Sequence, residues 1–319
     1  MHNRHLTRRQ ALAQTGLLLS TALAGRKLNA ATTPSEVSVG NKPFRFCLNT
    51  ATIRGQKLGI EKEIEIAAKA GYDAIEPWVD TLQEYVKSGG KLSDLKKRIR
   101  DSGLTVEDAI GFPEWLAEDD SRRAQGLERA KREMDLVAQI GGKRFAAPPA
   151  GATDLPRIEF SKAVERYRAL LDAGDQIGLV PQLELWGFSK NLNRLGECIG
   201  VAMETGHPKA CVLADVFHLY KGGSDFRGLR LLSADAIQVL HMNDYPGEPA
   251  RDKIDDSYRG YPGDGVAPLP ELLTTLAHTG GQKVLSLELF SRKYWAMDPV
   301  EVAANGLTKM KSVAEKVRL

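Results

Sequence analysis

The 319-residue sequence predicts an α/β protein consisting of a single (β/α)8 TIM barrel preceded by an N-terminal export signal. Short β-rich runs alternate with longer helical runs from residue 44 to the C-terminal end, which favours a barrel. No stretch rich in Pro, Gly or Ser divides this region into two domains. The first β-rich run is not followed by the Gly-x-Gly-x-x-Gly turn of a dinucleotide-binding sheet, so a doubly wound fold is disfavoured.

Residues 1–31 have the layout of a secretory signal. The pair Arg8-Arg9 precedes a mildly apolar stretch from Ala11 to Gly25, and Ala22-Leu23-Ala24 offers a cleavage site. The paired arginines resemble a twin-arginine export signal, which implies the twin-arginine export machinery as a partner and a periplasmic location. We therefore expect the barrel to occupy residues 42–319. An amphipathic N-terminal helix is the alternative interpretation.

The charge balance argues against a nucleic-acid partner. The chain has 44 Lys and Arg against 41 Asp and Glu, and five of the basic residues lie in the expected signal, which leaves 39 basic residues. No run of 18 apolar residues occurs, so we expect no membrane span in the mature protein. The three cysteines match no zinc or redox spacing, and Cys47 and Cys211 are expected to be buried. The sequence leaves the oligomeric state open, a homo-oligomer included.

The expected strands are short apolar runs, many of them β-branched, bounded by turn residues. In order they are Phe44–Asn49, Ala74–Pro77, Thr105–Ile110, Arg144–Ala147, Val180–Leu185, Cys211–Asp215, Ile237–Met242 and Val284–Leu289. The expected helices follow a 3.6-residue apolar period, and several end at a Gly that suits a left-handed C-cap. They are Gly59–Ala70, Lys91–Asp101, Asp119–Ile140, Ser161–Ile177, Leu192–Thr205, Phe226–Leu232, Pro270–Thr279 and Pro299–Lys316.

Four consecutive strands carry an acid or an imidazole at the end that faces the active site of a barrel. These residues are Glu184, Asp215, His241 and Glu288. A carboxylate between leucines is unfavourable to bury without a partner, so four such positions suggest a shared one. Three carboxylates and an imidazole suit one divalent cation, Mn²⁺ or Mg²⁺ before Co²⁺ or Zn²⁺. For any one of these residues alone, a salt-bridged core position is the alternative.

The strand ends Leu183-Glu184, Asp215-x-x-His218, His241-Met242-Asn243-Asp244 and Leu287-Glu288 resemble those of the xylose-isomerase-like TIM barrels, the sugar-phosphate isomerase/epimerase superfamily. Ketose 3-epimerases, hydroxypyruvate isomerase, inosose dehydratase and endonuclease IV share this fold. The resemblance covers the chain from Phe44 onward.

In the epimerase branch, the residues matching the four strand-end groups hold one metal, and the two glutamates also exchange protons with the substrate. The resemblance therefore implies catalytic roles for Glu184 and Glu288 and a substrate contact for His218. Epimerases usually carry an Arg soon after the His-x-x-Asp strand. Here Arg251 comes later than in that pattern, and we treat it with Asp244 as a candidate substrate-binding residue.

The residue types also suggest a reaction. A metal that chelates a carbonyl and a neighbouring hydroxyl acidifies the C–H between them and stabilises the resulting ene-diolate. Two carboxylates on opposite sides can remove and return the proton, which gives isomerisation or epimerisation of a keto-sugar or related carbohydrate. Loss of a β-hydroxyl instead gives a lyase or dehydratase acting on a keto-sugar or a 3-keto-glycoside. An endonuclease IV-like nuclease is a remote alternative, because its three-metal site needs many histidines and this chain has six. A non-catalytic sugar-binding protein is disfavoured because both proton-handling glutamates are present.

Aromatic residues cluster after the predicted strands, where sugar faces would pack on them, so a small carbohydrate substrate is expected. They are Trp78, Phe112, Trp115, Trp186, Tyr294 and Trp295, of which Trp78 and Trp186 are the preferred substrate contacts. Glu76 is expected to bind substrate hydroxyls or to support the metal ligands. The long irregular stretch before Pro270 is expected to form a lid, in which Lys253 and Arg259 would meet an anionic or polyhydroxyl substrate.

Overall fold

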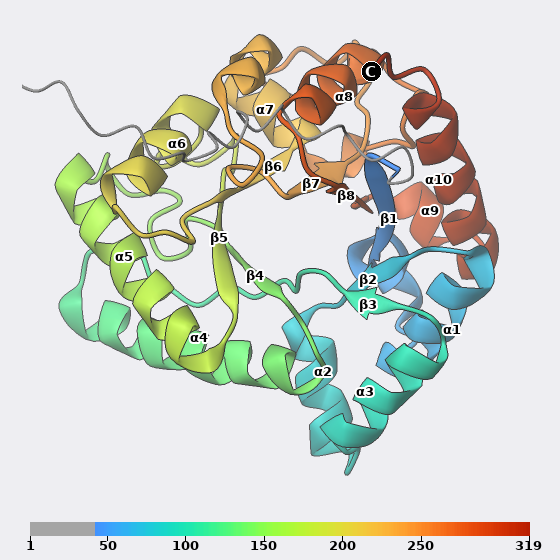
Figure 1. Cartoon of the computed structure of the whole chain (residues 1–319), viewed down its shortest axis with the longest axis horizontal. Coiled ribbons are helices and arrows are strands. Elements are labelled where there is room, and N and C mark those ends of the chain that lie inside the picture. Colours follow the sequence, from blue (N-terminus) through green and yellow to red (C-terminus); the bar gives the residue numbers. More distant parts are fainter. Residues whose placement is uncertain (1–41) are drawn as a thin grey trace, which may run out of the picture. The chain divides into compact units, whose positions relative to one another are not determined.

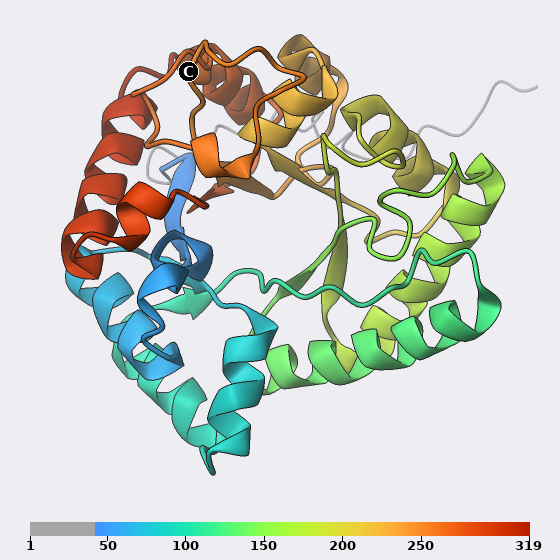
Figure 2. The same cartoon turned by 180° about the vertical axis from the view of Figure 1, so that it is seen from behind.

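Eight parallel strands surround the centre of the computed structural model, which describes residues 42–319 (Figure 1). Helices cover the outside of the strands in both views (Figure 2). The barrel predicted from the sequence is confirmed. The strands are β1 (Phe44–Asn49), β2 (Ala74–Glu76), β3 (Thr105–Val106), β4 (Arg144–Ala147), β5 (Val180–Glu184), β6 (Val212–Asp215), β7 (Val239–Met242) and β8 (Lys283–Leu287). The signal expected over residues 1–31 lies outside the described residues, so export stays a prediction.

The ladder of strands runs in the order β3-β2-β1-β8-β7-β6-β5-β4. Between β3 and β4, the amide of Ala146 donates a hydrogen bond of 3.0 Å to the carbonyl of Ala109. Strand β3 is shorter than the expected run to Ile110. Directly after it, the carboxylate of Asp108 accepts the Ala109 amide at 2.9 Å, which diverts this donor from strand pairing.

The helices that cover the barrel largely match the expected segments. They are α1 (Ile60–Ala70), α2 (Val79–Lys87), α3 (Leu92–Asp101), α4 (Asp120–Gln139), α5 (Phe160–Ile177), α6 (Leu195–Glu204), α7 (Val216–Gly222), α8 (Leu269–His278), α9 (Arg292–Trp295) and α10 (Pro299–Ala314). Short 3₁₀ helices are η1 (Thr50–Gln56), η2 (Phe226–Leu231) and η3 (Asp256–Tyr258). Gly71 and Gly178 have positive φ angles of 89° and 83° and cap α1 and α5, as expected.

Three helices were not expected, and one expected helix is a 3₁₀ turn. Helix α2 is short, and only Val79 and Leu82 of its residues are buried. Helix α7 begins directly after β6, because the side chain of Asp215 accepts the amide of His218 and caps the helix. The segment expected as a helix at 226–232 is η2, and α9 has only one turn.

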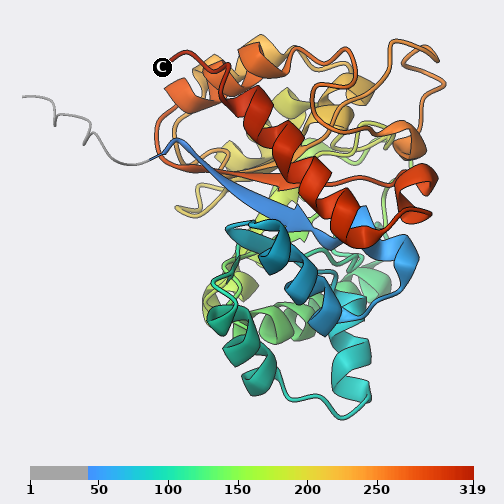
Figure 3. The same cartoon turned by 90° about the vertical axis from the view of Figure 1, so that its right-hand side faces the viewer.

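The apolar core fills the layer between the strands and the helices. Helix α10 runs along the outside of the barrel next to α1 and β1 (Figure 3). The three cysteines are buried and free, which confirms the expectation for Cys47 and Cys211. Within residues 42–319, no helix combines the length and the apolar character needed to cross a bilayer.

Candidate metal and substrate site

The structure brings the four strand-end groups together. Glu184 ends β5, Asp215 ends β6, His241 lies in β7, and Glu288 directly follows β8. The Nδ1 atom of His241 lies 3.1 Å from Oε2 of Glu288 and 3.8 Å from both Oε1 of Glu184 and Oδ2 of Asp215. Ligand atoms of Asp215, His241 and Glu288 all lie within 4.8 Å of one another. The parallel strands therefore place three acids around one imidazole nitrogen.

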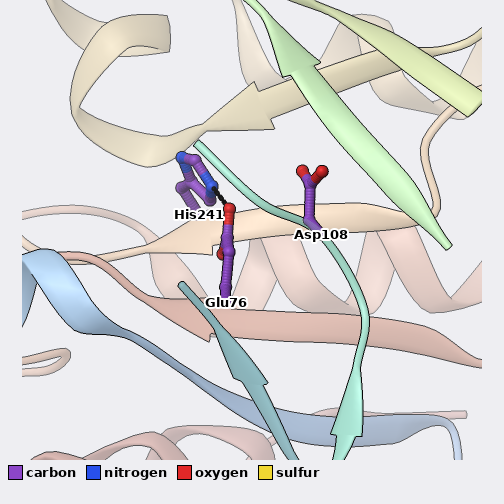
Figure 4. A group of neighbouring side chains, drawn as sticks. All are labelled: Glu76, Asp108 and His241. Carbon is purple, nitrogen blue, oxygen red and sulfur yellow. Dashed lines mark hydrogen bonds and ion pairs between the residues drawn. The ribbon is translucent and has the colours of Figure 1, made fainter. Parts of the chain in front are cut away.

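This cluster fits a divalent cation. His241 is fully buried, and its Nε2 lies 2.8 Å from Oε1 of Glu76 (Figure 4). The other oxygen of Glu76, Oε2, accepts a hydrogen bond from the hydroxyl of Ser286. Glu76 therefore favours the tautomer with its proton on Nε2. The Nδ1 atom has no hydrogen-bond partner among the described residues and faces the carboxylates, so its lone pair would be given to a cation bound there. A histidine that donates its other ring N–H to a carboxylate is the usual arrangement at a protein-bound metal.

Glu76 lies beneath His241 and not on the cavity surface. Its expected role as a substrate contact therefore does not fit this structure, whereas the alternative role in supporting the metal ligands does. Figure 4 shows Asp108 near the same pair, and ligand atoms of Glu76, Asp108 and His241 also lie within 4.8 Å of one another. Because His241 uses Nε2 toward Glu76, we assign the metal to the group that faces Nδ1. Asp108 accepts a hydrogen bond from Gln182 at 2.8 Å, and burial together with the charge of Glu76 raises its pKa.

The Asp-x-x-His spacing has a structural cause. Oδ1 of Asp215 caps α7 by accepting the amide of His218 at 2.7 Å. Its Oδ2 is left for the cluster and also accepts Nδ2 of Asn243 at 3.0 Å. One carboxylate therefore holds the start of the helix that carries His218 and faces the candidate metal position at the same time.

Arg259, in the loop that follows β7, reaches the centre of the site. Its Nη1 atom donates to Oδ2 of Asp215 at 2.7 Å and to Oε2 of Glu288 at 2.8 Å. Its Nη2 atom donates to Nε2 of His218 at 3.0 Å and to the carboxylate of Asp256 at 2.6 Å. The guanidinium is buried, and the carboxylates of Asp215, Asp256 and Glu288 raise its pKa despite the opposing effect of burial.

The bond from Arg259 fixes the tautomer of His218. A guanidinium can only donate, so Nε2 of His218 accepts and the ring proton is on Nδ1. This Nδ1 atom has no hydrogen-bond partner among residues 42–319. Burial lowers the pKa of His218 to about 3, so the ring is neutral at physiological pH. The result is a neutral imidazole whose Nδ1–H is buried and unpaired among the described residues, on a side chain that lines the cavity described below.

The two glutamates have different electrostatic surroundings. Burial, together with the charges of Glu288 and Asp215, raises the pKa of Glu184 well above its usual value. Burial acts in the same direction on Glu288, but the charges of His241 and Arg259 outweigh it and lower the pKa. Such divergence is typical of carboxyl pairs in which one group carries a proton and the other accepts one.

These groups open into a cavity of about 360 Å³. It is lined by Trp78, Ile110, Phe112, Glu184, Trp186, Phe188, His218, Asp256, Ser257, Arg259, Glu288, Phe290, Arg292 and Trp295. The loop after β7 thus contributes to the cavity, as expected, and so do Trp78 and Trp186. Trp115 is instead buried, with its indole N–H bonded to the carbonyl of Pro148 at 2.6 Å, and Tyr294 is buried beside Tyr261.

Two expected substrate contacts do not reach this cavity. Asp244 is buried and accepts the amides of Tyr245, Gly263 and Ala267 at 2.8–2.9 Å, so it organises the loop. Arg251 is exposed. The ammonium of Lys221 in α7 binds the carbonyls of residues 251, 252 and 254 at 2.7–3.0 Å and holds this segment against the helix. Arg259 takes the place that the sequence analysis gives to Arg251, and Lys253 is also exposed.

Two buried asparagines contact the candidate ligands but are not among the predicted site residues. Asn49 ends β1 and donates to Oε1 of Glu288 at 3.2 Å, and Asn243 follows β7 and donates to Asp215. Both are buried polar residues at strand ends, which is the signal that could have identified them. Asp108 and Asp256 could not be singled out in the same way, because acidic residues are common in irregular segments and on 3₁₀ turns.

Comparisons with known proteins agree with this architecture. The chain is 25% identical over 262 residues to the 3-dehydroshikimate dehydratase of Pseudomonas putida, covering 82% of this chain but only 40% of that protein. It is 24% identical over 277 residues to the inosose isomerase of Bacillus velezensis, covering 86% of this chain and 98% of that protein. A crystal structure of the IOLI protein with a binding zinc atom superposes with a TM-score of 0.79 at 22% identity, over 86% of this chain and 99% of that one. The sequence profile of the xylose isomerase-like TIM barrel matches residues 64–313, and the chain therefore belongs to this family.

Proposed function

We propose that this protein is a divalent-metal-dependent isomerase or epimerase that moves a proton at the carbon next to the carbonyl of a polyhydroxylated ketone. One observation carries the proposal: Glu184 and Glu288 come from strands β5 and β8, approach the same His241 nitrogen and line the same cavity. Two strands, β6 and β7, separate them in the sheet. Two carboxyl groups that reach one substrate carbon from different strands can remove a proton and return one.

The residues around the two glutamates have complementary tasks. Glu184, Asp215, His241 and Glu288 would hold the metal, which when bound supplies Lewis acidity toward a carbonyl oxygen. His218, which lines the cavity and is held by Arg259, would contact the substrate as a neutral imidazole. Proton return to the opposite face of the same carbon gives epimerisation, whereas return to the neighbouring carbon gives isomerisation.

A lyase is the second candidate, and the raised pKa of Glu184, which lines the cavity, is the observation that favours it. In its protonated form, Glu184 would give its proton to a hydroxyl group that departs from the carbon beyond the one that Glu288 deprotonates, which gives an unsaturated ketone and water. The similarity to a dehydratase and to an inosose isomerase supports both candidates. The zinc atom of the IOLI structure supports metal dependence and leaves the identity of the metal here open between Mn²⁺, Mg²⁺, Co²⁺ and Zn²⁺.

The test is a proton-exchange screen. The protein, loaded in turn with Mn²⁺, Mg²⁺, Co²⁺ or Zn²⁺, is incubated with keto-sugars, inososes and 3-keto-glycosides in deuterated water, and NMR follows exchange next to the carbonyl. Exchange followed by an isomer or epimer supports the first candidate. An unsaturated product, followed by ultraviolet absorbance, supports the lyase.

Substitution of one glutamate makes the test specific. Glu184→Gln keeps the shape of the side chain but removes the proton-accepting carboxylate, and we expect exchange to fall by about a hundred- to ten-thousand-fold. Glu204→Gln, on the exposed side of α6, is the matched control and should exchange at the wild-type rate. Wild-type exchange in a folded Glu184→Gln variant would contradict the two-carboxylate mechanism.

A further inference from the structure

Six aromatic side chains form a rim around the cavity: Trp78, Phe112, Trp186, Phe188, Phe290 and Trp295. The ring of Trp78 lies 5.2 Å from that of Phe112 and 6.0 Å from that of Phe290. Trp186 continues this contact at 5.8 Å from Phe112 and 5.2 Å from Phe188. Five of the six rings are therefore connected edge to face or at a tilt. A contiguous, partly exposed aromatic surface of this kind is typical of a binding surface.

Glu184, His218 and Glu288 form the polar floor of the cavity, below the rim. Glu184 and Glu288 are only 4% exposed, and aromatic residues follow each of them by two residues in the chain, at Trp186 and Phe290. Farther along, Phe188 is 43% exposed. Strands β5 and β8 end at these acids, and the chain continues from them into the loops at the C-terminal face of the barrel. The carboxylates therefore lie deep in the cavity, and the rings of the following residues lie toward its mouth.

Two of the indole N–H groups in the rim are already bonded within the protein. The indole N–H of Trp78 donates to Oδ1 of Asn49 at 3.1 Å, and that of Trp295 donates to the carbonyl of Ala51 at 2.9 Å. These two indoles therefore present only ring surface to the cavity. A ligand would therefore pack on these two rings through apolar surface, as an aromatic ring or the C–H face of a sugar does.

We infer that the substrate combines a polyhydroxylated ketone with an aromatic substituent, as in a keto-glycoside that carries a phenolic group. The ketone end lies on the polar floor beside Glu184, His218 and Glu288, and the aromatic substituent packs edge to face within the rim. A free monosaccharide would satisfy the floor and leave most of the rim unoccupied. This inference rests on the proposed function for the position of the ketone, and on the rim itself for the substituent.

A matched pair of ligands tests the inference. Methyl and 4-nitrophenyl 3-keto-β-glucopyranoside share the same keto-sugar, and isothermal titration calorimetry with the Mn²⁺-loaded full chain measures the affinity for each. Burial of the extra ring should make the nitrophenyl glycoside bind about ten- to a hundredfold more tightly. Phe188→Ala should reduce this preference by at least about threefold. Phe160→Ala, which removes a ring of similar exposure (47%) outside this cavity, should leave the preference unchanged.

Proton exchange separates this inference from the proposed function. The inference of an aromatic substituent would be overturned if the two glycosides bound with equal affinity or if neither bound. It would also be overturned if Phe188→Ala left the nitrophenyl preference intact. A clear nitrophenyl preference without exchange next to the ketone in either glycoside would uphold the aromatic subsite and contradict the proposed proton transfer. Exchange in both glycosides with equal affinity would uphold the proposed proton transfer and contradict the aromatic subsite.

Discussion

The contact between Glu76 and His241 makes a quantitative prediction about metal affinity. Glu76 is fully buried, accepts the ring N–H of His241 at 2.8 Å, and touches no position that a substrate could occupy. In Glu76→Gln, the amide oxygen can still accept this hydrogen bond, and the amide nitrogen can donate to Ser286. The substitution therefore preserves the shape of the contact and removes its charge. Glu76→Ala removes the acceptor as well.

The expected size of the effect follows from the strength of the two bonds. A hydrogen bond to a charged group contributes about 1.5–3 kcal/mol and a neutral one about 0.5–1.5 kcal/mol, so Glu76→Gln should weaken metal binding by about 1–1.5 kcal/mol, or roughly tenfold. Glu76→Ala leaves the buried N–H of His241 unpaired and frees the ring to change tautomer. Metal affinity in Glu76→Ala should therefore fall by close to a hundredfold, the upper end of the range for residues that support a metal ligand.

Isothermal titration of the full chain with Mn²⁺ measures this order of affinities, and circular dichroism checks that each variant folds. The matched control is Glu63→Gln, the same substitution at a buried glutamate of α1 that contacts none of the four candidate ligands. It should bind Mn²⁺ as tightly as the wild type does. Unchanged affinity in both folded Glu76 variants would refute the assignment of Glu76 as the residue that positions His241.

Two further predictions concern stability. Burial raises the pKa of Glu63 to about 7, so the folded state holds this proton more tightly than the unfolded state, and stability falls as pH rises from about 4.5 through 7. Glu63→Gln should therefore stabilise the protein by up to about 3 kcal/mol at pH 8 and by nothing measurable at pH 4, as urea denaturation at the two pH values would show; an equal gain at both would contradict the role of burial. Adding Mn²⁺ to chelator-treated protein at a hundred times its Kd should stabilise the fold by about 2.7 kcal/mol, or about 5 °C in Tm, because the ion binds the folded cluster alone. An unchanged Tm would argue against the metal site.

The four strand-end groups could be predicted from the sequence because the parallel strands of a barrel all end at the same face. Once Glu184 and Glu288 are placed at the ends of strands in one barrel, their convergence follows from the fold. The side on which a short strand points its side chains was harder to predict. Glu76 ends a three-residue strand, and its preference for His241 over the cavity depends on a contact 165 residues away in the chain.

Arg259 shows why loop residues could not be ranked from the sequence. The loop after β7 contains Arg251, Lys253 and Arg259 without any periodicity, so their spacing does not determine which one turns inward. The outcome depends on Lys221, which binds three carbonyls of the first half of the loop, and on the acids that receive Arg259 at its far end. Helix α7 was missed for a related reason, because the role of Asp215 as its cap is a local hydrogen bond and not an apolar pattern.

The bonds of Lys221 and Arg259 also bear on how a ligand enters and leaves. Lys221 and His218 lie one turn apart in α7, and Arg259 bonds to His218, so the helix and the loop are joined at two points. Opening the cavity on this side would break the Lys221 bonds and two buried ion pairs at once. On the aromatic side, rotation of Phe188, which is 43% exposed, requires no such rupture. We therefore expect a ligand to pass on the aromatic side, where side-chain rotation takes picoseconds to nanoseconds, while the groups around His241 keep their positions.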